Sequence, residues 1–91
     1  MSEVNFSYAD LTNADLSDSD LLGANLVGAD LEGANLSNAN LSGADLSKAV
    51  LANATFSGSN LSGANLSGAD LNDMVYDQNT ILKCVNHDIC I

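Results

Sequence analysis

The chain repeats itself every five residues from Ala9 to Leu71, and this period constrains the fold more than any other feature. Leu stands at every fifth position from Leu11 to Leu71, with Phe56 as the single exception. Ala, or Ser at two places, lies two positions before each of these, and the residue between is usually Asp or Asn. A repeat this regular indicates that one small structural unit is used many times.

Neither a helix nor a flat strand can bury these leucines on one face. A helix turns about 100° per residue, so a step of five rotates the side chain by about 140° and scatters the leucines around the cylinder. A strand alternates its faces, so an odd step sends successive leucines to opposite sides. The period instead predicts a solenoid that bends once per pentad and points every Leu to a common axis. The predicted core residues are Leu11, Leu16, Leu21, Leu26, Leu31, Leu36, Leu41, Leu46, Leu51, Phe56, Leu61, Leu66 and Leu71.

The two positions after each Leu favour such a bend. They are mostly Ser, Gly or Asn, as in Ser42-Gly43 and Ser62-Gly63. Gly takes a positive φ without steric cost, which a tight corner requires. Pro is absent, as expected for a backbone whose N–H groups form hydrogen bonds between coils.

The repeat resembles the pentapeptide-repeat family, whose consensus is A-(D/N)-L-x-x, over most of the chain from Val4 to Ile81. The resemblance implies an all-β fold, a right-handed quadrilateral β-helix with four pentads in each coil and about four coils in total. Residues 1–81 are expected to form this β-helix. In its stacked columns Tyr76 would lie below Phe56, and Ile81 would end another inward column.

Residues 82–91 leave the repeat and are predicted to form a C-terminal cap, either a short helix or an irregular lid. At the other end, Val4 and Phe6 already follow the repeat. The N-terminal edge is therefore expected either to be covered by Met1, Phe6 and Tyr8 or to pair with a second chain. The second arrangement predicts a homodimer through an open coil end.

The charge of the chain argues against several classes of partner. The formal net charge is −10, and Lys48 and Lys83 are the only strong bases. Direct binding to nucleic acid requires Lys and Arg against phosphate, so we expect none, and we expect no binding to anionic membranes for the same reason. No apolar run has the length of a membrane-spanning helix, and the start of the chain lacks the pattern of a secretion signal. We therefore expect a cytoplasmic protein.

Groups that support catalysis are scarce. The chain has one His and no Arg, and its many Ser occupy repeat positions with no base placed beside them. We expect neither an enzyme nor a bound cofactor. The spacing of Cys84, His87 and Cys90 admits three interpretations: buried free thiols, a disulfide, or a zinc site that would need a fourth ligand. A reducing cytoplasm favours the free thiols.

The position before each Leu is predicted to point outward and carries most of the acidic residues. Stacked Asn side chains are favourable, whereas stacked carboxylates repel each other. One interpretation is a solvated surface that keeps the protein soluble. The other is an acidic interaction face formed by Asp10, Asp30, Glu32 and Asp70.

These features favour a non-catalytic scaffold or protein-interaction module with an unidentified protein partner. The resemblance adds an alternative, because some members of the family imitate B-form DNA in size and charge and bind DNA gyrase or related topoisomerases. Those members are longer and dimerise through a C-terminal helical module that finds no match here. A third hypothesis is an accessory chain whose open ends stack onto a longer solenoid.

Overall fold

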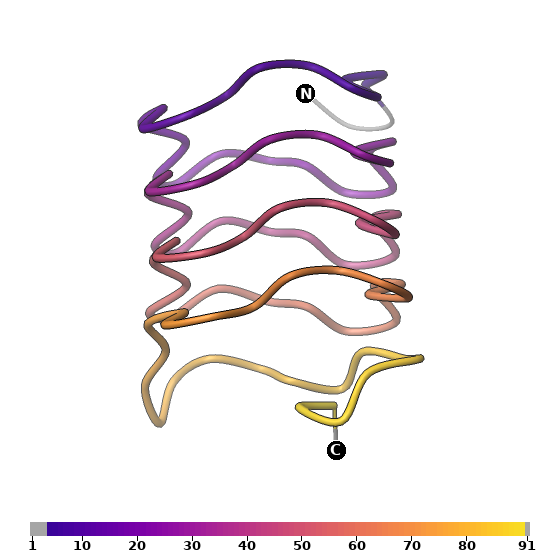
Figure 1. Ribbon diagram of the computed structural model, residues 1–91. Helices are drawn as coiled ribbons and strands as arrows, with labels where there is room; N and C mark the ends of the chain where they lie inside the picture. The colour runs from indigo at the N-terminus through magenta and orange to yellow at the C-terminus, as the bar shows by residue number, and fades with distance from the viewer. Residues whose placement is uncertain (1–3, 91) are drawn as a thin grey trace.

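A computed structural model describes residues 4–90 as a solenoid of stacked coils, with the chain advancing along the stack from the N-terminus to the C-terminus (Figure 1). The coils pair in parallel through single residues that are 20 apart, from Asn5 with Asn25 to Thr55 with Val75. Because each side takes five residues, this separation gives four sides per coil. Within residues 4–90 the backbone forms no helix and no strand of consecutive paired residues.

The corners are tight turns that recur every five residues. At each corner the N–H of the Ala donates to the carbonyl of the Leu three positions earlier, as from Ala44 to Leu41 at 3.0 Å. The residue just before the Ala has a positive φ, +69° at Gly43, which is the pattern of a type II turn. Gly, Asn and Asp occupy nearly all of these positions because they tolerate this conformation best, and the exceptions are Tyr8 and Lys48.

Hydrogen bonds between neighbouring coils use the backbone of each regular side. The N–H of Asn60 donates to the carbonyl of Ala39 at 3.0 Å, and its carbonyl accepts the N–H of Leu41 at 2.7 Å. A third bond joins the corner N–H of Gly43 to the carbonyl of Ser62 at 2.8 Å. Three bonds per side hold successive coils at a fixed separation.

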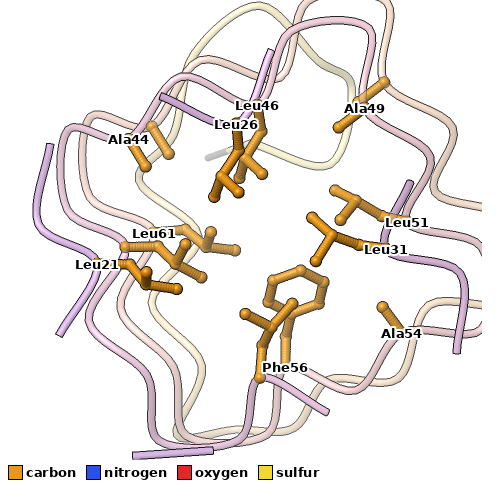
Figure 2. Packing of buried hydrophobic residues seen from close by; sticks show 14 of the residues in the cluster. Leu21, Leu26, Leu31, Ala44, Leu46, Ala49, Leu51, Ala54, Phe56 and Leu61 are labelled. Carbon is orange, nitrogen blue, oxygen red and sulfur yellow. The ribbon is translucent and has the colours of Figure 1, made fainter. Parts of the chain in front are cut away.

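The leucines converge on an apolar central column, and alanines fill the space beside them (Figure 2). The Leu positions from Leu21 to Leu66, with Phe56 among them, are at most 1% exposed. Leu11, Leu16 and Leu71 are half-buried because they lie near the two ends of the stack, where one neighbouring coil is missing. Burial of the central leucines therefore depends on coils on both sides.

Ser59 occupies one of the buried Ala positions, and its hydroxyl is the one buried side-chain polar group of residues 4–90 without a hydrogen-bond partner. We expect Ser59→Ala to raise the free energy of unfolding by about 1 kcal/mol, because it removes a desolvated hydroxyl. Chemical denaturation measures the change. Ser19→Ala is the matched control, since Ser19 is half-exposed and its hydroxyl can bond to water. A loss of stability in Ser59→Ala would show that this hydroxyl has a partner.

Two side chains near the C-terminal end do not point inward as predicted. Tyr76 is 50% exposed and does not stack below Phe56, and Ile81 is 41% exposed. Leu82 packs against the core instead of Ile81. The predictions of an aromatic stack and of an inward Ile81 are therefore wrong.

An extra residue between Val75 and Ile81 explains the exposure of Ile81. Ile81 pairs with Asn60 at a separation of 21 instead of 20, so it takes an outward position. The separation returns to 20 where Val85 pairs with Asn65. Pairing with the coil above thus continues past residue 81, into the segment that was expected to form the cap.

Side chains hold the turn that contains the extra residue. The carboxylate of Asp77 accepts the N–H of Gly58 at 3.2 Å, a donor that elsewhere in the repeat bonds to a backbone carbonyl. The hydroxyl of Thr80 donates to the carbonyl of Phe56 at 2.9 Å. The longer turn is stable because these side chains replace the regular backbone pairing.

Cys84 and Cys90 form a disulfide that closes the C-terminal segment onto the core. Cys84 is 6% exposed, and both Ile89 and Cys90 pack against the core cluster. The expectation of free thiols is therefore wrong, and the disulfide removes both thiolates that the zinc interpretation needs. His87 instead accepts the N–H of Ile89 at Nδ1, at 3.3 Å. Disulfides are unusual in a reducing cytoplasm, so the cytoplasmic location stays a prediction.

Candidate functional site

The outward Asp and Asn residues each support the corner that follows them. The oxygen Oδ1 of Asp45 accepts two hydrogen bonds from Ser47, one from its backbone N–H at 3.0 Å and one from its hydroxyl at 2.7 Å. Asn35 bonds to Ser37 in the same way, at 3.0 and 2.7 Å. This bond across two residues is an Asx turn, for which a longer Glu or Gln side chain is unsuited.

Sequence reasoning assigned these positions to the surface and missed their structural role. The signal was present, because the position holds Asp or Asn almost everywhere and never Glu or Gln. A requirement for solubility alone would have admitted Glu. The Ser or Thr that often stands two positions later is the second half of the same signal, since its hydroxyl adds a bond to the same oxygen.

The predicted acidic face is divided into two parts. Asp10 pairs directly with Asp30, and Glu32 follows Asp30 at the next corner. Val50 lies between Asp30 and Asp70 in the same column. At a coil separation of about 4.8 Å, Asp70 is about 10 Å from Asp30, so its carboxylate stands apart from the other three.

The outward positions change character along the stack. The first coil presents carboxylates at Asp10, Asp15 and Asp20. The C-terminal end presents Val75 and Val85, which are 49% and 45% exposed, together with Ile81. The outward positions are therefore acidic on three sides of the first coil and apolar on three sides of the last coil, where Asp70 occupies the fourth side.

Hydrogen bonds lower the pKa of several surface carboxyl groups. Donation from the Thr12 hydroxyl, and then from its N–H, lowers the pKa of Asp10. The Ser17 hydroxyl and N–H lower the pKa of Asp15 in the same way. For Asp77, desolvation raises the pKa, but bonds from the N–H groups of Asn79 and Gly58 and from Thr80 lower it by more.

These lowered pKa values predict a stability that depends on pH. A carboxylate whose folded pKa lies below its unfolded pKa of 3.8 stabilises the fold above that pH, and the contribution is lost as the pH falls through the folded pKa. We expect Asp15→Asn to keep the corner bond, as Asn35 does, and to remove this dependence. Urea denaturation between pH 5 and about pH 3 should show the wild type losing stability relative to the variant. If the free energy of unfolding fell equally with pH in both proteins, the lowered pKa of Asp15 would be contradicted.

The described residues enclose no pocket and hold no group of three or more His, Cys, Asp or Glu arranged to bind a metal ion. No helix of the part that the structure describes has the length and hydropathy to cross a membrane.

The fold defines a class of protein, a β-solenoid in which each pentad forms one side of a four-sided coil. Residues 1–38 and 34–73 match the model of pentapeptide repeats, with 8 copies of the repeat. The chain belongs to the pentapeptide repeat family. The family is known for right-handed quadrilateral β-helices.

Three solved structures illustrate the similarity. A pentapeptide repeat protein from the Arabidopsis thaliana thylakoid lumen is 31% identical, with a TM-score of 0.56 over 99% of this chain and 66% of that one. One from Nostoc Pcc 7120 is 37% identical, with a TM-score of 0.53 over 93% of this chain and 78% of that one. QnrB1, a plasmid-mediated fluoroquinolone resistance protein, is 27% identical, with a TM-score of 0.64 over 85% of this chain and 39% of that one.

A search of curated protein sequences gave no significant match. The chain spans 66% of the length of the Arabidopsis protein and 39% of that of QnrB1. The similarity therefore identifies the fold and the family.

Proposed function

We propose that the protein is a non-catalytic binding module, a small scaffold that presents side chains at fixed spacings to a protein partner. The observation that carries this proposal is the regular outward column, with one residue per side and a rise of about 4.8 Å per coil. The inward positions form the core, and the backbone groups are engaged in hydrogen bonds between coils. Recognition is thus left to the outward and corner side chains.

The hydroxyl groups and the single His fit a binding role better than a catalytic one. The hydroxyls of Ser17, Ser37 and Ser47 donate to the Asp or Asn two residues earlier. Within residues 4–90 no serine hydroxyl is hydrogen-bonded to a His or a Lys, and a nucleophilic Ser needs such a base within reach. These hydroxyls stabilise corners.

Affinity purification from the native host tests the proposal. The wild-type chain should enrich one protein, and two isosteric variants, Asp30→Asn and Asp45→Asn, should differ in how much of it they recover. Both substitutions keep the corner bond and remove one negative charge each, so the two variants have equal net charge but are altered on different sides of the solenoid. No enrichment over an unrelated acidic bait, or turnover of any substrate, would contradict a non-catalytic binding module.

A second candidate function is an acidic imitation of DNA that occupies a DNA gyrase or related topoisomerase. The similarity to a fluoroquinolone resistance protein favours it. The longest extent of the molecule is 28 Å, a length of B-DNA that carries about 16 phosphate charges. The formal net charge is −10, and the outward positions carry Asn as often as Asp, so the charge density is below that of DNA.

A supercoiling assay with DNA gyrase separates the two candidates. Imitation of DNA predicts inhibition that weakens with added salt and with the triple substitution Asp10→Asn, Asp30→Asn and Asp70→Asn. An absence of inhibition at high protein concentration would eliminate this second function and leave the first.

A further inference from the structure

The middle of the stack contains neighbouring departures from the repeat that weaken the fold. Val50 stands where most pentads have Asp or Asn, so it cannot accept a backbone N–H across its corner. The N–H of Ala52, which such a side chain would bond, has no hydrogen-bond partner within residues 4–90. At the preceding corner, Lys48 has a φ of +61°, a conformation that Gly, Asn and Asp tolerate better. Coils lie both above and below these residues, so their surroundings do not depend on either end of the stack.

Departures of this kind are expected where a residue serves binding instead of stability. Val50 and Ala52 are both half-buried, and together they form an apolar seat on the outer surface of their coil. Asn in place of Val50 would restore the corner bond, as Asn40 and Asn60 show at the equivalent positions of the next side. The apolar seat thus replaces a hydrogen bond that the rest of the repeat uses.

Two carboxylates flank the apolar seat. Asp30 pairs with Val50 from the coil above, and Asp70 pairs with it from the coil below. Each Asp uses Oδ1 to accept the N–H two residues later, at 3.1 Å for Asp30 and 3.0 Å for Asp70. Neither Oδ2 has a hydrogen-bond or ion-pair partner within residues 4–90. Thr55 also interrupts the Asp and Asn columns, but its stacked neighbours carry no charge.

The spacing of the two carboxylates matches one face of an α-helix. They are separated by two coils, which is a rise of about 10 Å. Helical residues seven apart lie on the same face with a rise of about 10.5 Å, and the residues three and four positions along lie between them. A helix laid along the stack would therefore place two basic side chains opposite Asp30 and Asp70 and an apolar side chain on Val50.

Other occupants fit this surface less well. An added strand would find no row of free backbone groups, because the N–H of Val50 donates to Ala29 at 2.9 Å and that of Leu51 donates to Asp70 at 2.7 Å. A second copy of the chain offers no helix within residues 4–90 and has only two Lys. Nucleic acid would set its phosphates against the two carboxylates.

We infer that the apolar seat and its two carboxylates bind an amphipathic helix of another protein, with Lys or Arg at two positions seven apart and an apolar residue between them. The cations pair with Asp30 and Asp70, and the apolar residue packs on Val50. This inference rests on the proposed function, because it names the surface and the partner chemistry of the same binding module.

Fluorescence anisotropy with a labelled Ala-rich helical peptide tests the inference. The peptide carries Arg at two positions seven apart, and Leu at the third and fourth positions after the first Arg. We expect saturable binding to the full chain that weakens about tenfold in the double variant Asp30→Asn with Asp70→Asn. The matched control, Asp15→Asn with Asp45→Asn, makes the same change in net charge on the two adjacent sides and should bind as the wild type does. A second peptide, with its Arg residues five apart and so turned about 140° from each other, should bind about tenfold more weakly.

Val50→Asn gives an independent test, because its expected effects on stability and on binding are opposite. It should raise the Tm by about 4 °C, since the new side chain can accept the N–H of Ala52. It should also weaken binding of the first peptide about tenfold, since the apolar contact is lost. Thr55→Asn is the matched control, because the N–H of Ser57 is likewise without a partner within residues 4–90. This control should raise the Tm in the same way and leave peptide binding unchanged.

Several results would overturn the inference. Equal loss of binding in both double variants, or equal binding of the two peptides, would show attraction by net charge alone. A Tm that does not rise in Val50→Asn would show that Val50 serves the fold, and no saturable binding of the first peptide would remove the helix as the occupant. A host protein that Val50→Asn and the Asp30 and Asp70 double variant recover as well as the wild type does would overturn the inference while the binding module stands. Recovery of no host protein by any form would contradict the module itself.

Discussion

Leu41→Ala is expected to lower the free energy of unfolding by about 2–5 kcal/mol. Leu41 is fully buried, with core leucines of the adjacent coils around it. The cavity left by the lost methyl groups cannot close, because three backbone bonds per side hold each coil at a fixed distance from its neighbours. Thermal unfolding followed by circular dichroism should show a fall of about 10 °C or more in the Tm, and urea denaturation gives the free energy directly.

The neighbouring residue provides the control. Ser42 is half-exposed, and its hydroxyl makes no hydrogen bond to the protein. Ser42→Ala should therefore change the free energy of unfolding by less than about 0.5 kcal/mol. Equal effects at the two positions would mean that Leu41 does not point toward the axis, and the fold described above would be wrong.

Loss of the disulfide is expected to lower the free energy of unfolding by about 2 kcal/mol. The bond joins residues that are 6 apart in sequence, and this short loop restricts the unfolded chain less than a long one would. It also holds Ile89 and Cys90 against the core at the C-terminal end. Denaturation of the wild type with and without a reducing agent measures the effect.

The double variant Cys84→Ser with Cys90→Ser separates the bond from the reagent. It should unfold at the denaturant concentration of the reduced wild type, and the reducing agent should leave it unchanged. A reduced wild type as stable as the oxidised form would show that the segment from Asn86 to Cys90 packs on the core without the disulfide. Hydrogen exchange tells whether the loss of stability is confined to this end. If it is, the exchange rate at Leu41 should be unaffected by reduction.

The repeat was sufficient to predict the solenoid, the family and the corners. The period of five excludes a helix and a flat strand, and the glycines mark the residue with positive φ, as at Gly43 and Gly63. A repeated unit makes the same prediction many times, so one atypical residue such as Phe56 does not disturb it. The inward and outward positions then follow from the register.

The C-terminal end could not be predicted in the same way, because each of its features occurs once. The extra residue before Ile81 depends on two particular side-chain bonds, from Gly58 to Asp77 and from Thr80 to Phe56. Tyr76 falls on the Leu register, but it starts the altered turn and lies at the end of the stack, where Leu71 is also incompletely buried. The pairing of Cys84 with Cys90 likewise depends on where the chain folds after Val85.

The candidate site was predicted in part. The acidic residues were recognised, but the use of their oxygens in Asx turns was not, since composition does not distinguish a carboxylate in water from one that accepts a backbone N–H. The interruption of the acidic face by Val50 follows from the 20-residue columns.

The extra residue between Val75 and Ile81 also indicates where the gene can gain or lose codons. It lies where only one coil has to match it, and the pairing returns to its usual separation because the next side, from Ile81 to Val85, is one residue shorter than the side from Asn60 to Asn65. A single-residue insertion deeper in the stack would have to match coils above and below, and would turn a Leu out of the core on at least one side. Insertions and deletions in the interior should therefore be tolerated as complete coils of 20 residues, whereas single-residue changes should be confined to the ends.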